Sequence, residues 1–518
     1  MTALRKLTII NLLVTGRPRR QTAALLLLLA LVAGACSSTS KTDDLTEPTS
    51  TDAPLATDDT TASSSPAATS SGTAAAPLPG GFTEEEVPAG TKPAPVVAGG
   101  GEVKHGRGVT ATTIKLGVNV SAPLGPAFAA VGFAGDPAAT DERRIAEILV
   151  KYINSHGGLH GRKIIPVYNQ YDAVGGGTWD SLAAEACQRF VADEKVFAVI
   201  SGHVGQTDSL LDCLAKGDTP LIQQNQWPYD GKYFNDFKNY LYQPSRMRPE
   251  RFVPAWIKGL KDGGYFDAGA KVGIARFDSP VFARISTLIK NELKKIGQKV
   301  LVEAVLHTPQ SVSDFGRMAS EFQSAVLKFR QADVDHVLFD EYAGEMPFFG
   351  LTVAENQRYR PRWAFNSTNL TNTIQAQHDD RQLTGAVSVT WLPGQDIADR
   401  HDPRMGKGVL AKCYDIIKKG GMVPSRLYTG IFCDSFLFLE KILSTTNNIT
   451  PVGMGEAAAK VGTTYESPYT WTTKFGPGRT DGASSVRIVK YTLNCVTDPE
   501  SGEKRGCFKL SGGDRPAG

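Results

Sequence analysis

Seven cysteines are the residues of this 518-residue chain whose chemistry is most easily constrained. Thiols can form disulfides, hold metal ions or act as nucleophiles, but the chain contains no Cys-x-x-Cys pair and no Cys/His spacing typical of a zinc site. An even set of cysteines in an exported chain indicates disulfides. Six remain once Cys36 is assigned a different role, and these are Cys187, Cys213, Cys413, Cys433, Cys495 and Cys507. Fifteen pairings are open, and we expect sequence neighbours to pair: 187–213, 413–433 and 495–507.

Cys36 ends an apolar run near the N-terminus. Residues 1–22 carry five basic side chains and no acid, and an alanine- and leucine-rich run from Ala23 follows. This order is typical of a secretory signal, and the run is shorter than the ~20 residues of a membrane-spanning helix. Ala33-Gly34-Ala35-Cys36 resembles a bacterial lipobox, although Ala33 replaces the usual leucine. We therefore expect residues 1–35 to be a lipoprotein signal peptide and Cys36 to be lipidated; an ordinary signal cleaved near Ala35 and an uncleaved anchor are the alternatives.

Motifs of enzymes are missing from the sequence. It has no G-x-S-x-G elbow, no H-E-x-x-H pair and no P-loop. Gly175-Gly176-Gly177 lacks the spacing of a dinucleotide-binding loop, so it indicates a turn. We expect no catalytic residue, no cofactor and no metal.

The net charge of +3 divides unevenly along the chain. The predicted signal supplies +5, and the Ser/Thr/Pro/Asp-rich segment 36–111 supplies −6, which leaves a dilute +4 for the rest. Segment 36–111 contains too little apolar surface to offset its conformational entropy, so it predicts a disordered tether. No basic stripe interleaved with aromatics occurs, and we expect no nucleic-acid partner.

From residue 112 onward, short apolar runs alternate with amphipathic stretches. The predicted strands are 113–120, 163–171, 196–202, 219–224, 271–277, 299–306, 335–341, 361–366, 385–391 and 486–492. The predicted helices are 140–156, with Thr140 as N-cap, then 178–194, 206–216, 249–262, 280–296, 312–332, 344–356, 403–419 and 427–445. This alternation predicts an α/β fold of two Rossmann-like lobes with parallel sheets. Ligands of such sheets bind beyond the carboxyl ends of the strands, so the cleft between the lobes is the expected site.

Several motifs in this order carry a family resemblance. Residues 154–163 read Asn-Ser-His-Gly-Gly-Leu-His-Gly-Arg-Lys, 195–202 read Lys-Val-Phe-Ala-Val-Ile-Ser-Gly, and Asp314-Phe315 precedes a helix and the strand at 332–339. Together they resemble type I periplasmic binding proteins, the leucine/isoleucine/valine-binding family that serves ABC importers, over roughly residues 110–495. The lipobox and the acidic tether resemble those of lipoprotein members from Gram-positive bacteria, especially actinobacteria.

The resemblance implies a hinge that the chain crosses three times. Lobe 1 would comprise 112–243 and 392–481, and lobe 2 would comprise 244–391 and 482–518. Cys187 and Cys213 would then lie on adjacent helices of lobe 1, which favours their pairing.

The ligand residues that the resemblance implies come from both lobes. Lobe 1 would contribute His203, Gln206 and Thr207 from one loop, and Gln224, Asn225 and Trp227 from a second. Ser121 follows the first strand and would line the cleft as well, unless residues 121–128 form only a long turn. Lobe 2 would contribute the aromatic Tyr342 together with Asn366 and Ser367, where amino-acid binders of the family carry an acid. A buried ammonium without a counter-charge is costly, so a standard α-amino acid is disfavoured. Amides, hydroxyls and aromatic rings favour a neutral or weakly charged polar ligand with a planar or sugar-like surface. Residues 223–227 could instead be a packed strand end, and His203 could bond only to backbone.

These features predict a monomeric solute-binding lipoprotein on the extracytoplasmic face of the cell membrane. Its partners would be a small-molecule solute, the permease subunits of an ABC importer and the membrane, reached through the lipid on Cys36. A ligand-sensing receptor of the same fold and a surface-tethered enzyme are the alternatives.

Overall fold

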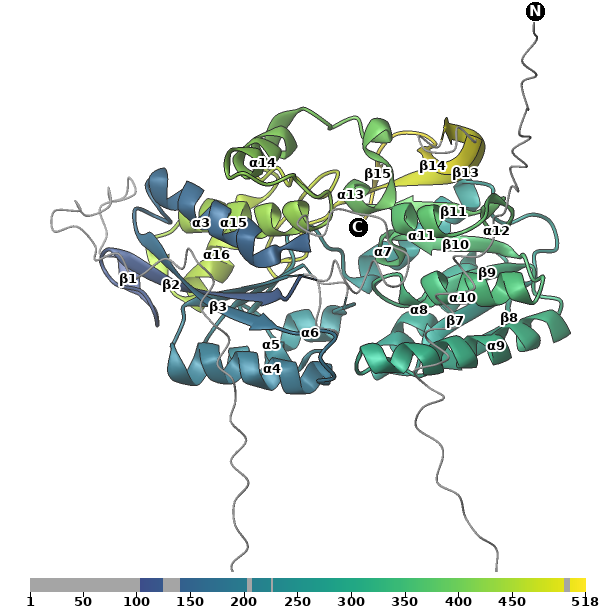
Figure 1. The fold of residues 1–518 in the computed structure, drawn as a ribbon, viewed down its shortest axis with the longest axis horizontal. Helices are drawn as coiled ribbons and strands as arrows, with labels where there is room; N and C mark the ends of the chain where they lie inside the picture. The colour runs from purple at the N-terminus through teal and green to yellow at the C-terminus, as the bar shows by residue number, and fades with distance from the viewer. Residues whose placement is uncertain (1–102, 124–139, 203–206, 225–226, 498–503) are drawn as a thin grey trace, which may run out of the picture. The chain divides into compact units, whose positions relative to one another are not determined.

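The computed structural model of the chain describes residues 103–123, 140–202, 207–224, 227–497 and 504–518. The predicted signal peptide, Cys36 and almost all of the predicted tether lie outside these ranges. All described residues belong to one structural unit, Lys92–Gly518, and this unit contains two main β-sheets (Figure 1). We call the part built on the first sheet lobe 1 and the part built on the second sheet lobe 2.

The first sheet has five strands in the order β3-β2-β4-β5-β6, and every neighbouring pair is parallel. Its strands are β2 Thr113–Ser121, β3 Lys163–Tyr171, β4 Ala198–Ser201, β5 Leu221–Gln223 and β6 Leu241–Tyr242. Strand β4 is buried along its whole length, as expected for a central strand covered by helices on both faces. The prediction of a parallel α/β lobe is confirmed here.

Helices cover both faces of the first sheet. They are α3 Glu142–Ser155, α4 Trp179–Cys187, α5 Ser209–Lys216, α6 Gly231–Asp236, α14 Gly408–Lys419, α15 Tyr428–Leu443 and α16 Pro451–Val461. Figure 1 shows α3 and α15 on one face and α4 and α5 on the other. Helix α3 buries Ile145, Leu149 and Ile153 at helical spacing, and this apolar stripe packs it against the sheet. A small parallel pair, β1 Lys104–His105 with β12 Asn448–Ile449, forms a separate two-stranded sheet.

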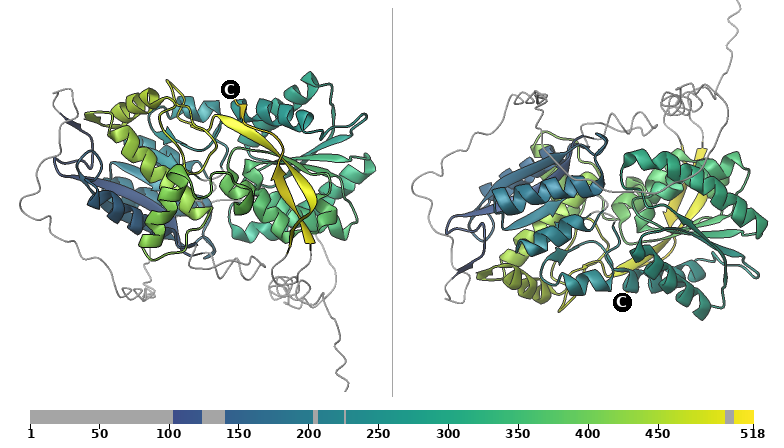
Figure 2. Two further views of the ribbon diagram at one scale, coloured as in Figure 1. Left: turned by 90° about the horizontal axis from the view of Figure 1, so that it is seen from above. Right: turned by 90° about the horizontal axis from the view of Figure 1, so that it is seen from below.

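The second sheet follows the order β14-β13-β11-β10-β9-β7-β8, with the short β15 also paired to β13. Its strands are β7 Val272–Phe277, β8 Val300–Leu306, β9 His336–Asp340, β10 Arg362–Asn366, β11 Val387–Thr390, β13 Ser485–Thr497, β14 Lys504–Leu510 and β15 Arg515–Pro516. The pairs from β8 to β11 are parallel, whereas β13, β14 and β15 pair antiparallel. Figure 2 shows β13 and β14, in yellow, beside the green strands of this sheet. The predicted parallel α/β sheet is confirmed for β7 to β11. At one edge it is extended by antiparallel strands, because the chain that returns from lobe 1 enters β13 in the direction opposite to β11 and then turns back as β14.

Helices of lobe 2 connect the parallel strands. The longer ones are α7 Pro249–Asp262, α8 Pro280–Lys295, α9 Phe315–Gln331 and α10 Glu345–Asn356, and the shorter ones are α11 Thr371–Gln377, α12 Asp380–Leu383 and α13 Pro393–Asp396. Single 3-10 turns lie at η3 Val312–Asp314, η4 Ser367–Asn369 and η5 Asp399–His401.

The chain passes between the lobes three times. It leaves the first sheet after β6, returns after β11 to form α14 to α16, and crosses again before β13. The first and third crossings lie side by side, because Gln243 N donates to Thr480 O at 2.9 Å and Gly482 N donates to Gln243 O at 3.0 Å. These crossings form the hinge that the family resemblance implies.

Two local predictions are corrected. The N-cap of α3 is Asp141 rather than Thr140, because the Asp141 side chain accepts a hydrogen bond from Arg144 N at 2.9 Å. The helix predicted over 178–194 is α-helical only to Cys187 and continues as a π-helix, η2 Gln188–Asp193. The three predicted disulfides are confirmed, with Cα–Cα distances of 6.1 Å for Cys187–Cys213, 6.1 Å for Cys413–Cys433 and 5.5 Å for Cys495–Cys507.

Candidate functional site

The carboxyl ends of strands β2 and β4 meet a buried acid. Ser121 ends β2, and its backbone N–H donates to Glu142 Oε2 at 2.8 Å. Glu142 begins α3 and is fully buried. Gly202 follows β4, and a Cβ built on it would stand only 2.5 Å from the same Oε2. A glycine is therefore needed here for the carboxylate to reach the end of β2.

A row of polar side chains continues along this edge of the first sheet. Asn169 Nδ2 donates to Asn119 Oδ1 at 2.9 Å, and Asn119 Nδ2 donates to Ser201 Oγ at 3.3 Å. Asn119 and Ser201 line a cavity of about 20 Å³ together with the predicted ligand residue Thr207, a volume that suits one water molecule. Thr207 Oγ1 itself donates to Asp180 Oδ1 of α4 at 2.5 Å. This edge is polar and pre-organised, as a site for a polar solute requires.

Lobe 2 presents an aromatic cluster after β7 and β9. Tyr342 follows β9 and is fully buried, with its ring centroid 5.3 Å from that of Phe277 and 5.8 Å from that of Phe282. Trp227 of lobe 1 reaches this cluster, and its ring lies 5.4 Å from Tyr342 and 5.9 Å from Phe282. Two residues predicted as ligand contacts, one from each lobe, are thus brought together where the lobes meet.

Two further contacts join the lobes near the same place. Arg284 of α8 forms an ion pair with Asp230, whose side chain is 5% exposed, with an Nε–Oδ2 distance of 2.5 Å. The backbone N–H of Trp179 in α4 donates to Gln310 O at 2.9 Å. The lobes are therefore in direct contact on the side of the strand ends.

Carboxyl groups flank the tyrosine of the cluster. Glu341 is buried and Glu345 is partly buried, with its Oε2 shielded from solvent. Burial raises the pKa of each carboxyl well above its ordinary value. Burial, followed by the proximity of Glu345 and Glu341, raises the pKa of the Tyr342 hydroxyl in turn. Burial therefore favours the protonated form of both carboxyl groups, which can donate a hydrogen bond as well as accept one.

Three other predicted ligand residues make hydrogen bonds within the protein. Gln224 is fully buried, its amide donating to Asp434 Oδ2 at 2.5 Å and accepting from Ser245 Oγ at 2.8 Å. Asn366 Oδ1 accepts from Thr368 N at 2.8 Å and caps η4. Ser367 Oγ donates to Asp396, whose pKa burial raises to about 6 despite the hydrogen bonds it accepts. The structure places these side chains in buried polar networks.

The remaining predicted ligand residues, His203, Gln206 and Asn225, lie outside the described residues. Sequence reasoning missed Glu142, Glu341 and Glu345. Glu142 was visible only as an acid in the first turn of a helix, a position usually explained by the helix dipole.

One group in the described part of the chain has the ligand types of a metal site. His401 Nε2 lies 3.7 Å from Cys495 Sγ and 3.4 Å from Cys507 Sγ. Both sulfurs are joined to each other in a disulfide, so they are not thiolates that could bind a metal.

Comparison with known proteins defines the class. A family model described as periplasmic binding protein matches residues 131–401. The chain belongs to this family. The sequence motifs had predicted a resemblance to its type I members. Curated proteins give no match to the sequence.

Solved structures share the fold at low sequence identity. A solute-binding protein from Rhodopseudomonas palustris HaA2 in complex with p-hydroxybenzoic acid is 16% identical with a TM-score of 0.55, the match covering 78% of this chain and 97% of that one. A fatty acid ABC transporter substrate-binding protein from Thermomonospora curvata is 16% identical with a TM-score of 0.54 (79% and 95% covered). LivJ from Streptococcus pneumoniae in complex with isoleucine is 16% identical with a TM-score of 0.52 (77% and 100% covered). These relatives are substrate-binding proteins rather than enzymes, in agreement with the sequence prediction. No helix in the described ranges is long and apolar enough to cross a membrane.

Proposed function

We propose that the chain is an extracytoplasmic solute-binding lipoprotein that delivers a small polar ligand to an ABC importer. The observation that carries the proposal is the contact of Trp227 with Tyr342, which joins the two lobes where the segments after β5 and β9 meet. A ligand that binds better when the lobes are closed shifts the hinge toward the closed form. The closed form then docks on the permease.

The ligand proposed is neutral or weakly charged, with a planar or sugar-like surface. Trp227 and Tyr342 offer flat ring faces, and Glu341 and Glu345, whose pKa values burial raises, offer hydrogen bonds beside them. Ser121 and Thr207 would contribute polar contacts from lobe 1, together with His203, Gln206 and Asn225. Gln224, Asn366 and Ser367 would not contact the ligand; their hydrogen bonds within the protein would fix the strand ends that carry the contacting residues. The complex of a structural neighbour with p-hydroxybenzoic acid supports the idea that this fold can hold a planar ring.

The proposed domain plan assigns residues 112–243 and 392–481 to lobe 1 and residues 244–391 and 482–518 to lobe 2. The proposed lipid on Cys36 and the tether 36–111 would keep both lobes near the membrane. Replacing Cys36→Ser should release the protein from membrane fractions into the medium. Mass spectrometry that finds unmodified Cys36 in membrane fractions would refute the anchor.

Native mass spectrometry of the purified protein tests the binding function directly. We expect the wild-type protein to carry a co-purified small molecule. The Tyr342→Ala variant should lack this added mass, because it removes a ring from the contact between the lobes. Tyr240→Ala is the control, because the Tyr240 hydroxyl donates to Asp218 within lobe 1, outside the cleft. Equal retention of the molecule by both variants would place the ligand elsewhere. Micromolar binding of leucine or isoleucine in calorimetry would contradict the proposed ligand class.

A further inference from the structure

The Cys495–Cys507 disulfide differs from the other two in its surroundings. It joins the neighbouring antiparallel strands β13 and β14, whereas the other two disulfides each join a pair of helices. Cys507 is buried and Cys495 is partly exposed, so the bond lies near the surface. His401 of η5 lies against both sulfurs, its Nε2 being 3.4 Å from Cys507 Sγ and 3.7 Å from Cys495 Sγ. Two sulfur atoms and one imidazole nitrogen therefore meet at one point.

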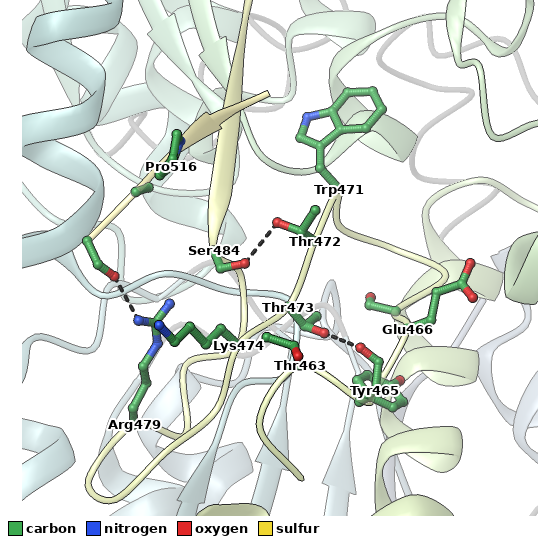
Figure 3. A pocket seen from close by; sticks show the side chains of 13 residues that line it. Thr463, Tyr465, Glu466, Trp471, Thr472, Thr473, Lys474, Arg479, Ser484 and Pro516 are labelled. Carbon is green, nitrogen blue, oxygen red and sulfur yellow. Dashed lines mark hydrogen bonds between the residues drawn. The ribbon is translucent and has the colours of Figure 1, made fainter. Parts of the chain in front are cut away.

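The backbone holds the two cysteines together independently of their bond. Strands β13 and β14 pair on both sides of Cys495, with a register shift between Thr492 and Val496. The chain is also tied just before β13, where Thr472 Oγ1 meets Ser484 Oγ at 2.8 Å (Figure 3). Reduction of the disulfide would therefore leave two thiols side by side rather than release a chain segment.

Contacts of the neighbouring residue fix the position of His401. Asp402 is buried, and its Oδ2 lies 3.0 Å from Arg404 Nη2 and 3.0 Å from Arg426 Nη2. The backbone N–H of His401 donates to Ala398 O at 2.8 Å within the turn η5. The imidazole is thus carried by a supported turn, as a preorganised ligand requires.

The distances within this group fit a tetrahedral zinc site. Zn–S bonds of about 2.3 Å and Zn–N bonds of about 2.0 Å at tetrahedral angles place sulfur and nitrogen about 3.6 Å apart. The two observed distances from His401 Nε2, 3.4 and 3.7 Å, lie on either side of this value. After reduction the two sulfurs would have to lie about 3.8 Å apart, which strand positions with Cα atoms 5.5 Å apart allow.

Positive charge near the group favours the form of cysteine that binds metals. Arg400 precedes His401, Lys509 lies on β14 two residues beyond Cys507, and both cations act electrostatically on the imidazole. Cations near a thiol stabilise its thiolate. Two thiolates balance the charge of one Zn²⁺ ion, so the occupied site adds no net charge beside these cations.

We propose that Cys495, Cys507 and His401 form a redox-gated metal site, which binds Zn²⁺ once the disulfide has been reduced. A dithiol reductant supplies two electrons and two protons: the S–S bond breaks, two thiols form, and the dithiol becomes a disulfide. Zn²⁺ then displaces the two thiol protons and is also bound by His401 Nε2, which leaves the fourth tetrahedral position to water. The ion would join β13 to β14 in place of the disulfide and would add η5 to the link. Solute binding in the cleft is not required for any of these steps.

Zinc binding by the full chain before and after reduction tests the site. The secreted Cys36→Ser form is the parent protein, because it lacks the seventh thiol. A phosphine serves as the reductant, because a dithiol would compete for the metal. We expect the reduced chain to bind one Zn²⁺ with a Kd on the order of 1 μM, and the oxidised chain to bind none at this concentration. Co²⁺ added instead of Zn²⁺ should give the charge-transfer absorption of cobalt–thiolate bonds.

Substitutions decide which residues hold the ion. His401→Ala removes the nitrogen ligand and should weaken zinc binding at least about 10-fold. His156→Ala is the matched control, because His156 ends α3 and its Nδ1 lies 2.8 Å from Tyr152 O, outside this group; it should leave the Kd unchanged. The double variant Cys495→Ser/Cys507→Ser should bind no zinc after reduction.

Four results would overturn the proposal. They are equal zinc affinity of the oxidised and reduced chains, equal affinity of His401→Ala and His156→Ala, zinc retained by Cys495→Ser/Cys507→Ser, and no binding by the reduced chain up to about 100 μM. If a variant fails to fold, X-ray absorption of zinc bound to the reduced parent decides instead. Two sulfur neighbours at about 2.3 Å with a nitrogen at about 2.0 Å would support the site, and any other number of sulfur neighbours would overturn it.

Discussion

A single missing side chain at Gly202 lets a buried acid organise the polar edge of lobe 1. Glu142 would otherwise meet a Cβ at 2.5 Å, and its hydrogen bond to Ser121 N would be lost. Acidic side chains are common at helix starts, because they interact favourably with the helix dipole. The close approach shows that this one serves the neighbouring strand end.

Gly202→Ala should therefore lower the free energy of unfolding by about 1–3 kcal/mol, because the added methyl overpacks a filled site. Urea unfolding measures the change. Gly316→Ala is the matched control: Gly316 lies in the first turn of α9, and a Cβ added there would have nothing within 4 Å. The control should be neutral or stabilise by up to about 1 kcal/mol. Equal effects of both substitutions would contradict the packing argument.

The buried Asp396 predicts a pH dependence of stability. Burial raises its pKa from 3.8 to about 6 in the folded protein, so the unfolded chain ionises first as the pH rises. The contribution of Asp396 to stability is therefore greatest below about pH 4, falls between about pH 4 and 6, and is constant above that; the total fall is about 3 kcal/mol. Unfolding at pH 4.0, 5.0 and 6.5 should show this fall in the wild type relative to Asp396→Asn. A constant difference between the two proteins across this range would show that the pKa is not raised.

At the scale of elements, apolar runs predicted the central strands closely. Strand β3 and helix α7 have the predicted bounds. In α7 the buried Phe252, Trp256 and Leu260 follow the helical period even though Pro254 lies inside the helix. Helix α16 was missed because its sequence contains two glycines and a proline near its start. Its Met454 is fully buried, so packing rather than local propensity makes it helical. The return hairpin of β13 and β14 was only half predicted, since β14 has no strong apolar alternation.

The disulfides tie these elements together to different extents. Cys187–Cys213 closes a separation of 26 residues between α4 and α5, and Cys495–Cys507 closes one of 12 between β13 and β14. Chain-entropy arguments predict losses of about 3.5 and about 2.8 kcal/mol on removing each pair. Denaturant unfolding of the double Cys→Ala variants should show a larger loss for Cys187/Cys213. The reverse order would indicate that native-state contacts outweigh loop closure.

The candidate site was predictable at the level of the loops that follow the strands, but not residue by residue. Tyr342 and Trp227 follow β9 and β5, and the parallel topology brings such positions to one edge of each sheet. Whether a side chain there faces a ligand or a buried partner depends on residues far away in the sequence. Gln224, for example, bonds to Asp434, 210 residues further along the chain, and no local pattern signals that pairing.

At the scale of the whole molecule, the balance between open and closed lobes depends on a small number of contacts. Trp227 is 7% exposed and packs on lobe 2, whereas the Arg284–Asp230 pair has a cation that is 42% exposed. Asp230 is buried, but solvent reaches Arg284 and screens the pair, and the desolvation of Asp230 offsets part of the attraction, so the pair contributes on the order of 1 kcal/mol. Burying a large apolar side chain contributes about 2 kcal/mol or more. The tryptophan should therefore dominate closure.

Trp227→Ala should shift the lobes toward the open form even without added solute. Loss of about 2 kcal/mol from the closed form changes the closed-to-open ratio about 30-fold. Spin labels at Glu185→Cys on α4 and Lys294→Cys on α8 would report this shift as longer interlobe distances in electron–electron double resonance. Trp227→Phe is the control, because a phenyl ring retains most of the stacking on Tyr342 and should keep the wild-type distances. Unchanged distances in Trp227→Ala would mean that the hinge crossings, rather than the aromatic contact, hold the lobes together.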